Sequence, residues 1–186
     1  MPRSSLCALG HGRDELHLSV RLAASDVTLT MTRKVRLSVD AELRRATERD
    51  LPALSTWSGH VKGTFAPAVA SDDRVLLVAN ANGRFPIGHL LVDLTGGVLS
   101  HLLVLGGFRD QGLGTALIVE GERVLRERGV MHATLVVEKA NDGAIRLYER
   151  LGYAREGETD EVFDEPMPDG TVQPVGHPSW VMRKEL

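Results

Sequence analysis

The chain has 186 residues, of which 42% are hydrophobic and 25% charged, as is ordinary for one soluble domain with a substantial core. A net charge of -3 and an aromatic content of 4% argue against nucleic-acid binding, which needs basic surfaces or stacking side chains. The single cysteine, Cys7, excludes an internal disulfide and is typical of a reducing compartment. The seven histidines lack metal-binding spacing, and no apolar run reaches the roughly 20 residues of a membrane span. We therefore expect a cytoplasmic protein with no metal ion and no nucleic-acid or membrane partner.

The first residues, 1–38, differ in character from the rest of the chain. Charged residues at 13–15 interrupt this segment before any apolar stretch long enough for a signal peptide. Met31 is a second candidate start, so the residues before it are either a leader or a partly ordered extension. We expect an N-terminal extension over 1–38, followed by one domain over 39–186.

The domain begins with a predicted strand and a predicted helix. The stretch 41–46 is typical of a strand. Thr47, followed by Asp50 three residues later, resembles a capping box, and Leu51 and Leu54 continue with helical spacing. A strand and then an amphipathic helix are therefore expected at the start of the domain.

Three apolar segments with strand character follow, separated by turns that contain glycine. The segments are 74–80, 86–94 and 98–105. The turns are Asn82-Gly83 and Gly96-Gly97. Because such pairs favour tight turns between strands, we predict three neighbouring strands in an antiparallel meander.

Helices and strands alternate in the next part of the chain. Apolar residues recur with helical spacing over 112–128, and Gly129 is a typical helix end. The stretch 130–138 has strand character, and the apolar residues of 141–152 fall on one helical face. A long helix, a strand and a short helix are therefore expected in this order.

The C-terminal part is predicted as two strands joined by a loop. Strands are expected from Tyr153 onward and over 179–186, and the stretch 164–178, rich in Pro, Asp and Gly, is expected to be the loop. Taken with the preceding elements, this order predicts a mixed α/β (α+β) sheet with helices on its faces.

The segment "RDQGLG" at 109–114 leads directly into the predicted long helix. Backbone N–H groups at a helix N-terminus bind anions, and glycine lets an anion come close. A nucleotide P-loop would need a lysine where Thr115 stands, and a dinucleotide fingerprint would need a third glycine where Leu117 stands. The pattern that fits is Gln or Arg, any two residues, Gly, any residue, and then Gly or Ala. The structural alternative is a glycine-rich turn before a helix.

Two segments carry a resemblance to a known family. The segment "HLLVLGGFRDQGLGTALI" at 101–118 resembles the pyrophosphate-binding motif of the GNAT superfamily of acyl-CoA-dependent N-acyltransferases, and "NDGAIRLYERLGY" at 141–153 resembles the second motif of that family. The opening "ELRRATERDLPAL" at 42–54 is similar to the family's first strand and helix. The resemblance covers roughly residues 39–186. It implies the GNAT fold, in which a mostly antiparallel central sheet is splayed between its fourth and fifth strands and carries helices on both faces.

The resemblance also implies a reaction and a cosubstrate. Family members transfer an acyl group from acyl-CoA to an amine by direct attack in a ternary complex, without a covalent enzyme intermediate. We therefore expect an N-acetyltransferase with acetyl-CoA as cosubstrate and a primary amine as acceptor. Family members are often homodimers, which makes a homodimer compatible with the resemblance. The acceptor stays open because segments 51–72 and 156–178 carry no signature, although the acidic stretch 160–169 is suited to a cationic amine.

By the resemblance, three groups of residues bind the cosubstrate. The pyrophosphate lies on the segment that comprises Arg109, Asp110, Gln111, Gly112, Leu113, Gly114 and Thr115. The pantetheine chain lies between strands 98–105 and 131–138, along the backbone of Leu102, Leu103 and Val104, where the Val104 N–H polarises the thioester carbonyl. Asn141, which we expect to cap its helix, and Tyr148 also contact the cosubstrate.

The resemblance assigns one catalytic group and leaves another open. Tyr148 matches the family tyrosine that protonates the departing thiolate, a role suited to a phenol, and the alternative is that Tyr148 is a core aromatic residue. The glutamates that serve as general base in some members correspond to Val98 and Val136 here. Glu138, two residues from Val136 and on the same strand face, is the candidate base. The other candidates are His101, Asp93, His89 and a chain of water molecules. The alternative for His89 and His101 is that they are histidines whose hydrogen bonds are satisfied within the strands.

Two other classes of function are compatible with parts of the sequence. Because the usual glutamates are missing, a non-catalytic acyl-CoA-binding or regulatory module would explain a chain that binds the coenzyme without turnover. A structural or interaction protein that keeps the fold without the coenzyme is disfavoured, since all of the motif residues are present. These residues are Arg109, Gly112, Gly114, Asn141 and Tyr148.

Overall fold

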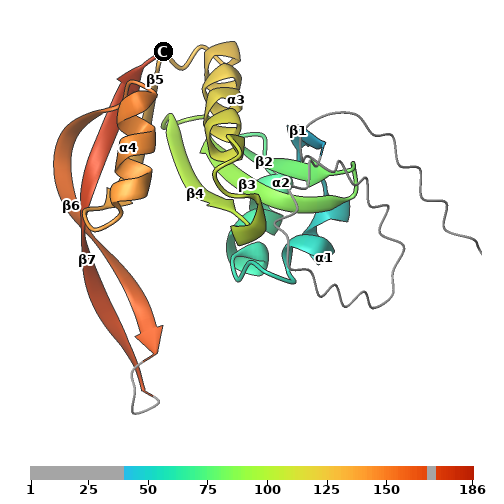
Figure 1. Cartoon of the computed structure of the whole chain (residues 1–186), viewed down its shortest axis with the longest axis horizontal. Helices are drawn as coiled ribbons and strands as arrows, with labels where there is room; N and C mark the ends of the chain where they lie inside the picture. The colour runs from blue at the N-terminus through green and yellow to red at the C-terminus, as the bar shows by residue number, and fades with distance from the viewer. Residues whose placement is uncertain (1–39, 167–170) are drawn as a thin grey trace, which may run out of the picture. The chain divides into compact units, whose positions relative to one another are not determined.

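The computed structural model describes residues 40–166 and 171–186 (Figure 1). Within it, Ala41–Leu186 forms one compact unit. The predicted N-terminal extension over 1–38, with Cys7 and Met31, lies outside the described residues. No helix in the described part of the chain is long and apolar enough to cross a membrane.

The strands form one mixed sheet in the order β1-β2-β3-β4-β5-β7-β6. The strands are β1 Ala41–Arg45, β2 Arg74–Ala81, β3 Phe85–Asp93, β4 Val98–Val104, β5 His132–Glu138, β6 Ala154–Pro166 and β7 Val172–Glu185. All neighbours are antiparallel except β4 and β5, which are parallel. The mixed α/β class and the antiparallel meander of β2, β3 and β4 are therefore confirmed.

Within residues 40–166 and 171–186, four α-helices and three short irregular helices accompany the sheet. The α-helices are α1 Leu51–Leu54, α2 Ala66–Val69, α3 Leu113–Glu127 and α4 Asp142–Arg150. The short helices are the 3-10 turns η1 Glu48–Asp50 and η3 Gly106–Phe108 and the π-helical turn η2 Val61–Phe65. The two helices of the predicted motifs, α3 and α4, are the longest of these.

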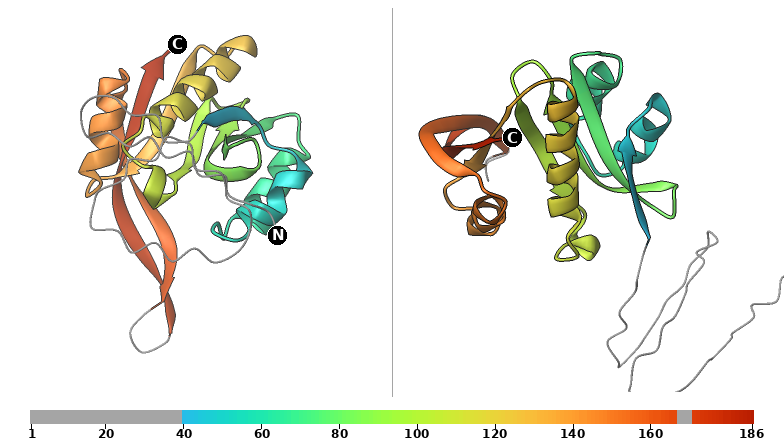
Figure 2. Two further views of the ribbon diagram at one scale, coloured as in Figure 1. Left: turned by 45° about the vertical axis from the view of Figure 1, so that its right-hand side comes forward. Right: turned by 90° about the horizontal axis from the view of Figure 1, so that it is seen from above.

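The sheet is splayed between β4 and β5, as the resemblance implied. Among the described residues these strands pair at a single position, Val98 with Thr134. Because β4 and β5 share only this pairing, the sheet has two parts. We call β1–β4 with α3 the β1–β4 half, and β5–β7 with α4 the β5–β7 half (Figure 1). Figure 2 shows α3 beside the strands of the β1–β4 half and α4 beside those of the β5–β7 half. A gap therefore opens in the middle of the sheet.

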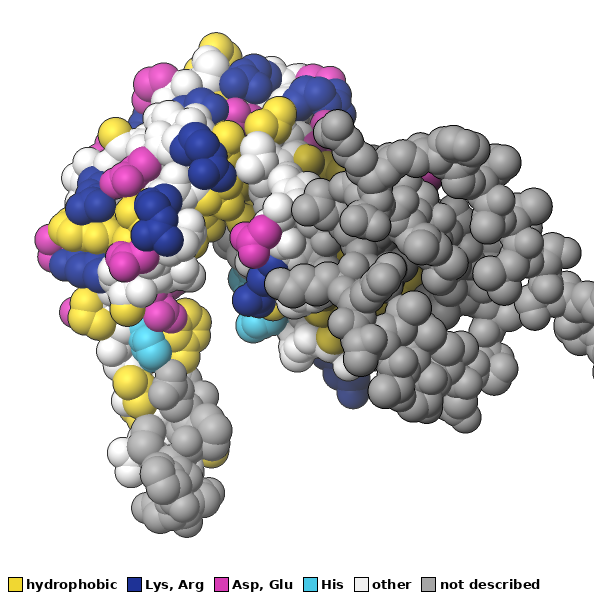
Figure 3. Space-filling model, viewed as in Figure 1, with side chains coloured by type: hydrophobic (Ala, Val, Ile, Leu, Met, Phe, Trp, Pro, Cys, Tyr) yellow, Lys and Arg dark blue, Asp and Glu magenta, His cyan; other side chains and the backbone are white. Residues whose placement is uncertain are grey.

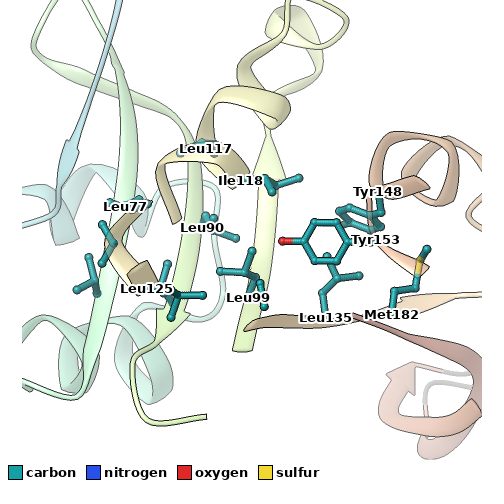
Figure 4. Close-up of a cluster of buried hydrophobic side chains, with 14 of the residues drawn as sticks. Leu77, Leu90, Leu99, Leu117, Ile118, Leu125, Leu135, Tyr148, Tyr153 and Met182 are labelled. Atoms are coloured by element: carbon teal, nitrogen blue, oxygen red, sulfur yellow. The ribbon is translucent and has the colours of Figure 1, made fainter. Parts of the chain in front are cut away.

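One apolar cluster continues through both halves (Figure 4). Its buried members include Leu77, Leu90 and Leu99 from β2, β3 and β4, Leu117, Ile118 and Leu125 from α3, and Leu135, Tyr148 and Met182 from β5, α4 and β7. A second cluster covers the opposite face of β2 and β3, with Leu54, Phe65, Leu76, Val78 and Leu91 among its members. Because β2 and β3 are buried on both faces, their sequences are continuous apolar runs.

Helix α3 lies very close to the sheet and also bonds to the other half. A Cβ atom on Gly121 would lie 2.9 Å from Cδ2 of Leu90 and 3.1 Å from Cδ2 of Leu99, so a larger residue here would push these two side chains aside. The neighbouring Glu122 side chain is 3% exposed, and both of its oxygens accept from Nζ of Lys184 on β7 at 2.8 Å. An ion pair thus connects α3 to the β5–β7 half.

The predicted helix after Thr47 is broken into short pieces. Asp50 accepts a hydrogen bond from the Thr47 backbone N–H at 2.8 Å, as in the expected capping box, but α1 ends at Leu54. The sequence analysis missed the helical turns η2 and α2 over 61–69. These turns contain Gly63 and Pro67, which weaken the helical pattern that periodicity detects.

The predicted loop over 164–178 is wrong. Most of it lies in β6 and β7, which pair from Ala154 with Arg183 to Pro166 with Val172. The β5 partner of β7 stops at the pair of Glu138 with Ser179, so each strand of the remaining ribbon has one free edge. Proline is tolerated at free strand edges because no ladder hydrogen bond is lost there. Pro174 and Pro178 therefore lie within β7 without ending it.

Candidate active site

A cavity of about 230 Å³ lies in the gap between β4 and β5. Its walls include Leu102 of β4, Ile118 of α3, Glu138 of β5, Asn141 and Tyr148 of the α4 segment, and Glu161 of β6. Figure 3 shows a hollow with apolar side chains between the two halves. Because these walls come from both halves, the splay of the sheet creates the cavity.

The β4 wall of the cavity contains a bulge. The register of β3 and β4 shifts between the pair His89–Leu103 and the pair Leu91–Ser100, so two β4 residues face one β3 residue. One of them, His101, has a φ of +52°, which is uncommon for a residue other than glycine. The bulge lies on the cavity, since Ser100, His101 and Leu102 all line it.

A buried histidine on β3 contacts this bulge. His89 is 1% exposed, and its Nδ1 lies 2.6 Å from the carbonyl oxygen of His101. Because a carbonyl oxygen only accepts, Nδ1 of His89 donates. The His89 ring stacks on Trp57 at a centroid distance of 5.1 Å and meets the edge of Phe65 at 4.7 Å. Burial lowers the pKa of His89 to about 4, so the ring is neutral near pH 7.

Tyr148 lies on the opposite wall. It is 8% exposed and packs in the main apolar cluster, and its ring meets that of Tyr153 at a centroid distance of 6.1 Å (Figure 4). Burial raises the pKa of Tyr148 above its ordinary value, which keeps the phenol protonated at neutral pH. Helix α4, which carries it, is capped by the Asn141 side chain, whose Oδ1 accepts from the Ala144 N–H at 3.1 Å. The predicted cap at Asn141 is thus present.

In the part of the chain that the structure describes, the N-terminus of α3 has no such cap. Gly112 precedes the helix with a φ of +81° and provides no side-chain cap, and no acidic residue stands in the first turn. Asp110 also has a positive φ, +61°. A Cβ atom on Gly112 would meet nothing within 4 Å. Free N–H groups and a helix dipole in open space form an arrangement that suits an anion.

Arg109 connects this helix start to the cavity wall. Its Nε donates to the carbonyl oxygen of Val104, the last residue of β4, at 3.0 Å. Gln111 donates from its side chain to the carbonyl oxygen of Gly107 at 3.3 Å. These contacts hold the predicted pyrophosphate segment at the end of the strand along which the pantetheine chain was expected.

Two carboxylates lie on the cavity. Glu138, the candidate base, ends β5, and Glu161 reaches the cavity from β6. Glu138 also lies 3.5 Å from Nδ1 of His177 on β7. Glu161 belongs to the acidic stretch 160–169.

The other candidate bases differ in their placement. Asp93 accepts hydrogen bonds from Thr95 and Gly96 in the turn after β3 and does not line the cavity. Nδ1 of His89 bonds to the bulge, whereas His101 is among the residues that line the cavity, and its ring meets those of His60 and Phe65 at centroid distances of 4.7 and 5.8 Å. Within the described residues, no group of three or more His, Cys, Asp or Glu side chains is arranged to hold a metal ion.

The structure brings some of the predicted site residues together and leaves others outside. Leu102, Glu138, Asn141 and Tyr148 line the cavity, whereas Leu103, Val104 and the segment 109–115 do not. The sequence analysis did not single out Ser100 and Ile118, which also line it, or the ring contacts around His89. The inward face of the predicted helix could have indicated Ile118, but no local signal indicates the others.

Comparisons with known proteins agree with this geometry. The model of the acetyltransferase (GNAT) family matches residues 40–153. Mycothiol acetyltransferase of Thermobispora bispora is 49% identical over 47 residues, which are 25% of this chain and 16% of that protein. The chain therefore spans only about a sixth of the length of this relative.

Solved structures extend the likeness over most of the fold. The ribosomal-protein-S18-alanine N-acetyltransferase from Escherichia coli superposes with a TM-score of 0.62 at 24% identity, over 78% of this chain and 94% of that one. Arabidopsis thaliana NAA60 in complex with acetyl-CoA gives a TM-score of 0.64 at 19% identity, over 79% of this chain and 99% of that one. At these identities the structures support the fold, and the family model covers more than half of the chain. This chain belongs to the GNAT family of acetyltransferases.

Proposed function

We propose that the protein transfers an acetyl group from acetyl-CoA to a primary amine in a ternary complex. The observation that carries this proposal is the cavity between β4 and β5, which has the bulge of β4 on one wall and Tyr148 on the other. A thioester in this cavity would lie between a strand with backbone donors and a buried phenol. Both groups are suited to acyl transfer to an amine.

The coenzyme end of the site is assigned to the start of α3. The uncapped N–H groups after Gly112 and the guanidinium of Arg109 would bind the pyrophosphate. The segment from Arg109 to Thr115 lies outside the cavity, as expected if the pyrophosphate stays near solvent while the thioester enters the gap. The pantetheine chain would then follow Leu102, Leu103 and Val104.

The reaction needs one proton donor and one proton acceptor. The amine nitrogen forms a bond to the acetyl carbon, and the carbon–sulfur bond breaks. Tyr148 gives its phenolic proton to the departing thiolate, which leaves as the free thiol. Glu138 accepts the proton that the amine loses, directly or through water. His101 is the second candidate for this role because it is also among the residues that line the cavity.

Charge at the cavity supports an amine acceptor. Glu138 and Glu161 would attract a cationic amine, and the chain has no Lys or Arg between Arg155 and Arg183. The names of the similar proteins include a mycothiol acetyltransferase and a ribosomal-protein-S18-alanine N-acetyltransferase. A test panel of acceptors therefore includes small amines and peptides with a free N-terminus.

The test combines binding and turnover. Acetyl-CoA is titrated calorimetrically, and thiol release is then followed with the amine panel for the wild type, Tyr148→Phe and Tyr153→Phe. Tyr153 is a matched control because it is a buried tyrosine next to Tyr148 that does not line the cavity. We expect only Tyr148→Phe to lower kcat, by about a hundredfold. Acetyl-CoA binding without turnover of any amine would favour the non-catalytic module instead.

A further inference from the structure

The β4 bulge has a support that lies outside the cavity. His101, in the bulge, has a positive φ, and its carbonyl oxygen accepts from Nδ1 of His89 on the neighbouring strand. A residue other than glycine keeps such a backbone conformation only when its surroundings hold it there. His89 supplies a short hydrogen bond, 2.6 Å, at that carbonyl.

The ring of His89 is itself fixed. Trp57 stacks on it with an interplanar angle of 10°, and Phe65 meets it edge-on at 4.7 Å. Phe65 belongs to the second apolar cluster and Trp57 packs against it, on the face of the sheet away from α3. The His89 ring is 1% exposed and contacts both, and its Nδ1 donates to the bulge.

The bulge decides where the next backbone groups of β4 point. Because a bulge inserts one extra residue, losing it would shift the following residues by one position and turn their side chains and backbone groups to the other side. The residues that follow His101 are Leu102, Leu103 and Val104, along which the pantetheine chain and thioester are proposed to lie. Past Val98, no pairing with β5 holds this edge of β4 in the described structure.

We propose that His89 is a positioning residue for thioester activation, because its Nδ1–H holds the β4 bulge that directs the backbone N–H groups to the thioester carbonyl. This inference rests on the proposed function. His89 does not touch the substrate, and it acts through the backbone of His101. Trp57 and Phe65, which contact the His89 ring, then also contribute to catalysis, although they lie on the face of the sheet away from α3.

Two substitutions separate the donor from the packing. His89→Phe keeps a ring against Trp57 and removes the donor. His89→Asn places an amide N–H close to the position of Nδ1 and removes the ring. If the donor matters, His89→Phe lowers kcat about ten- to a hundredfold, acetyl-CoA affinity stays unchanged, and His89→Asn keeps most of kcat. Thermal unfolding at neutral pH verifies that both variants are folded.

A spectroscopic measurement makes the test independent of the acceptor. The carbonyl stretch of carbonyl-13C-labelled acetyl-CoA bound to the protein falls in frequency when N–H groups polarise it. We expect the same lowered frequency in the wild type and in His89→Asn, and a return toward the value of free acetyl-CoA in His89→Phe. An unchanged stretch in bound His89→Phe, or a loss of kcat in His89→Asn equal to that in His89→Phe, would overturn the positioning role. Failure of the wild type to bind acetyl-CoA would instead overturn the proposed function.

Discussion

Helices α3 and α4 both contribute residues to the cavity between β4 and β5, but they differ in how their first turns are capped. In helix α4, Asn141 accepts from the first-turn N–H of Ala144, and Asp142 places a negative charge in that turn, which complements the helix dipole. Helix α3 starts after Gly112 with neither a side-chain cap nor an acidic residue. The chain therefore stabilises one helix start by itself and leaves the other free for an anion, although both belong to one continuous core.

The largest effect is expected when an acidic residue is placed at the start of α3, where it would remove the difference between the two helices. In Gly112→Glu, a carboxylate would compete for the same N–H groups, and we expect a loss of acetyl-CoA affinity of more than about a thousandfold, or about 4 kcal/mol, by calorimetry. Gly112→Ala is the control, because it shares the strain of the positive φ without the charge. Equal affinities for the two variants would show that backbone strain, and not the anion site, explains the loss.

A second substitution removes the ion pair that connects the two halves. Glu122 on α3 is buried and binds Lys184 on β7, with Arg126 at 3.5 Å. Glu122→Ala would leave Lys184 without this carboxylate. We expect the free energy of unfolding, measured by urea titration, to fall by about 3 kcal/mol. The double variant Glu122→Met with Lys184→Met is expected to regain much of this. If the single variant loses less than about 1 kcal/mol, apolar contacts alone hold the halves together.

Low pH is expected to destabilise the β1–β4 half through His89. Because the folded-state pKa of His89 is about 4 and the unfolded value is near 6.5, only the unfolded chain takes up this proton between these two pH values. The free energy of unfolding therefore falls as the pH drops from about 6.5 to about 4. We expect this group to contribute about 2 kcal/mol of the loss at pH 4.5. Urea titrations of the wild type and His89→Phe at pH 4.5 and 7.5 measure it, and an equal pH dependence in both would contradict it.

The smallest expected effect is at the capped helix. Asn141→Ala removes the acceptor for the Ala144 N–H, and we expect a loss of about 1 kcal/mol, or about 2–4 °C in Tm. Asn141→Asp keeps an acceptor and is expected to keep the Tm. A lowered Tm in both variants would mean that Asn141 acts through contacts other than the cap.

Local features of the sequence predicted the parts of the site that are local in the chain. The glycine segment at 109–114 and the cap at Asn141 each depend on a few adjacent residues, so their patterns could be read directly. The meander of β2, β3 and β4 was predictable because short glycine-containing turns join consecutive strands.

The remainder depends on contacts between distant residues. The prolines of 164–178 suggested a loop. They are tolerated in strands because β7 continues beyond its pairing with β5 and has a free edge there, which the sequence alone does not show. The bond from His89 to His101 requires a bulge, and the bulge is a matter of register between two strands. The carboxylate of Glu161 likewise reaches the cavity only through the pairing of β6 with β7.

The single pairing of Val98 with Thr134 also bears on how the molecule folds and opens. Strand pairs on the β1–β4 side join consecutive strands, and those on the other side lie within the C-terminal stretch from His132 to Glu185. Each side can therefore assemble from its own continuous stretch of the chain, without contacts to the other side. We expect native-state hydrogen exchange to reveal two cooperative units, whose amides are protected to different extents. Opening between these units would admit a substrate without the loss of any strand ladder within either one.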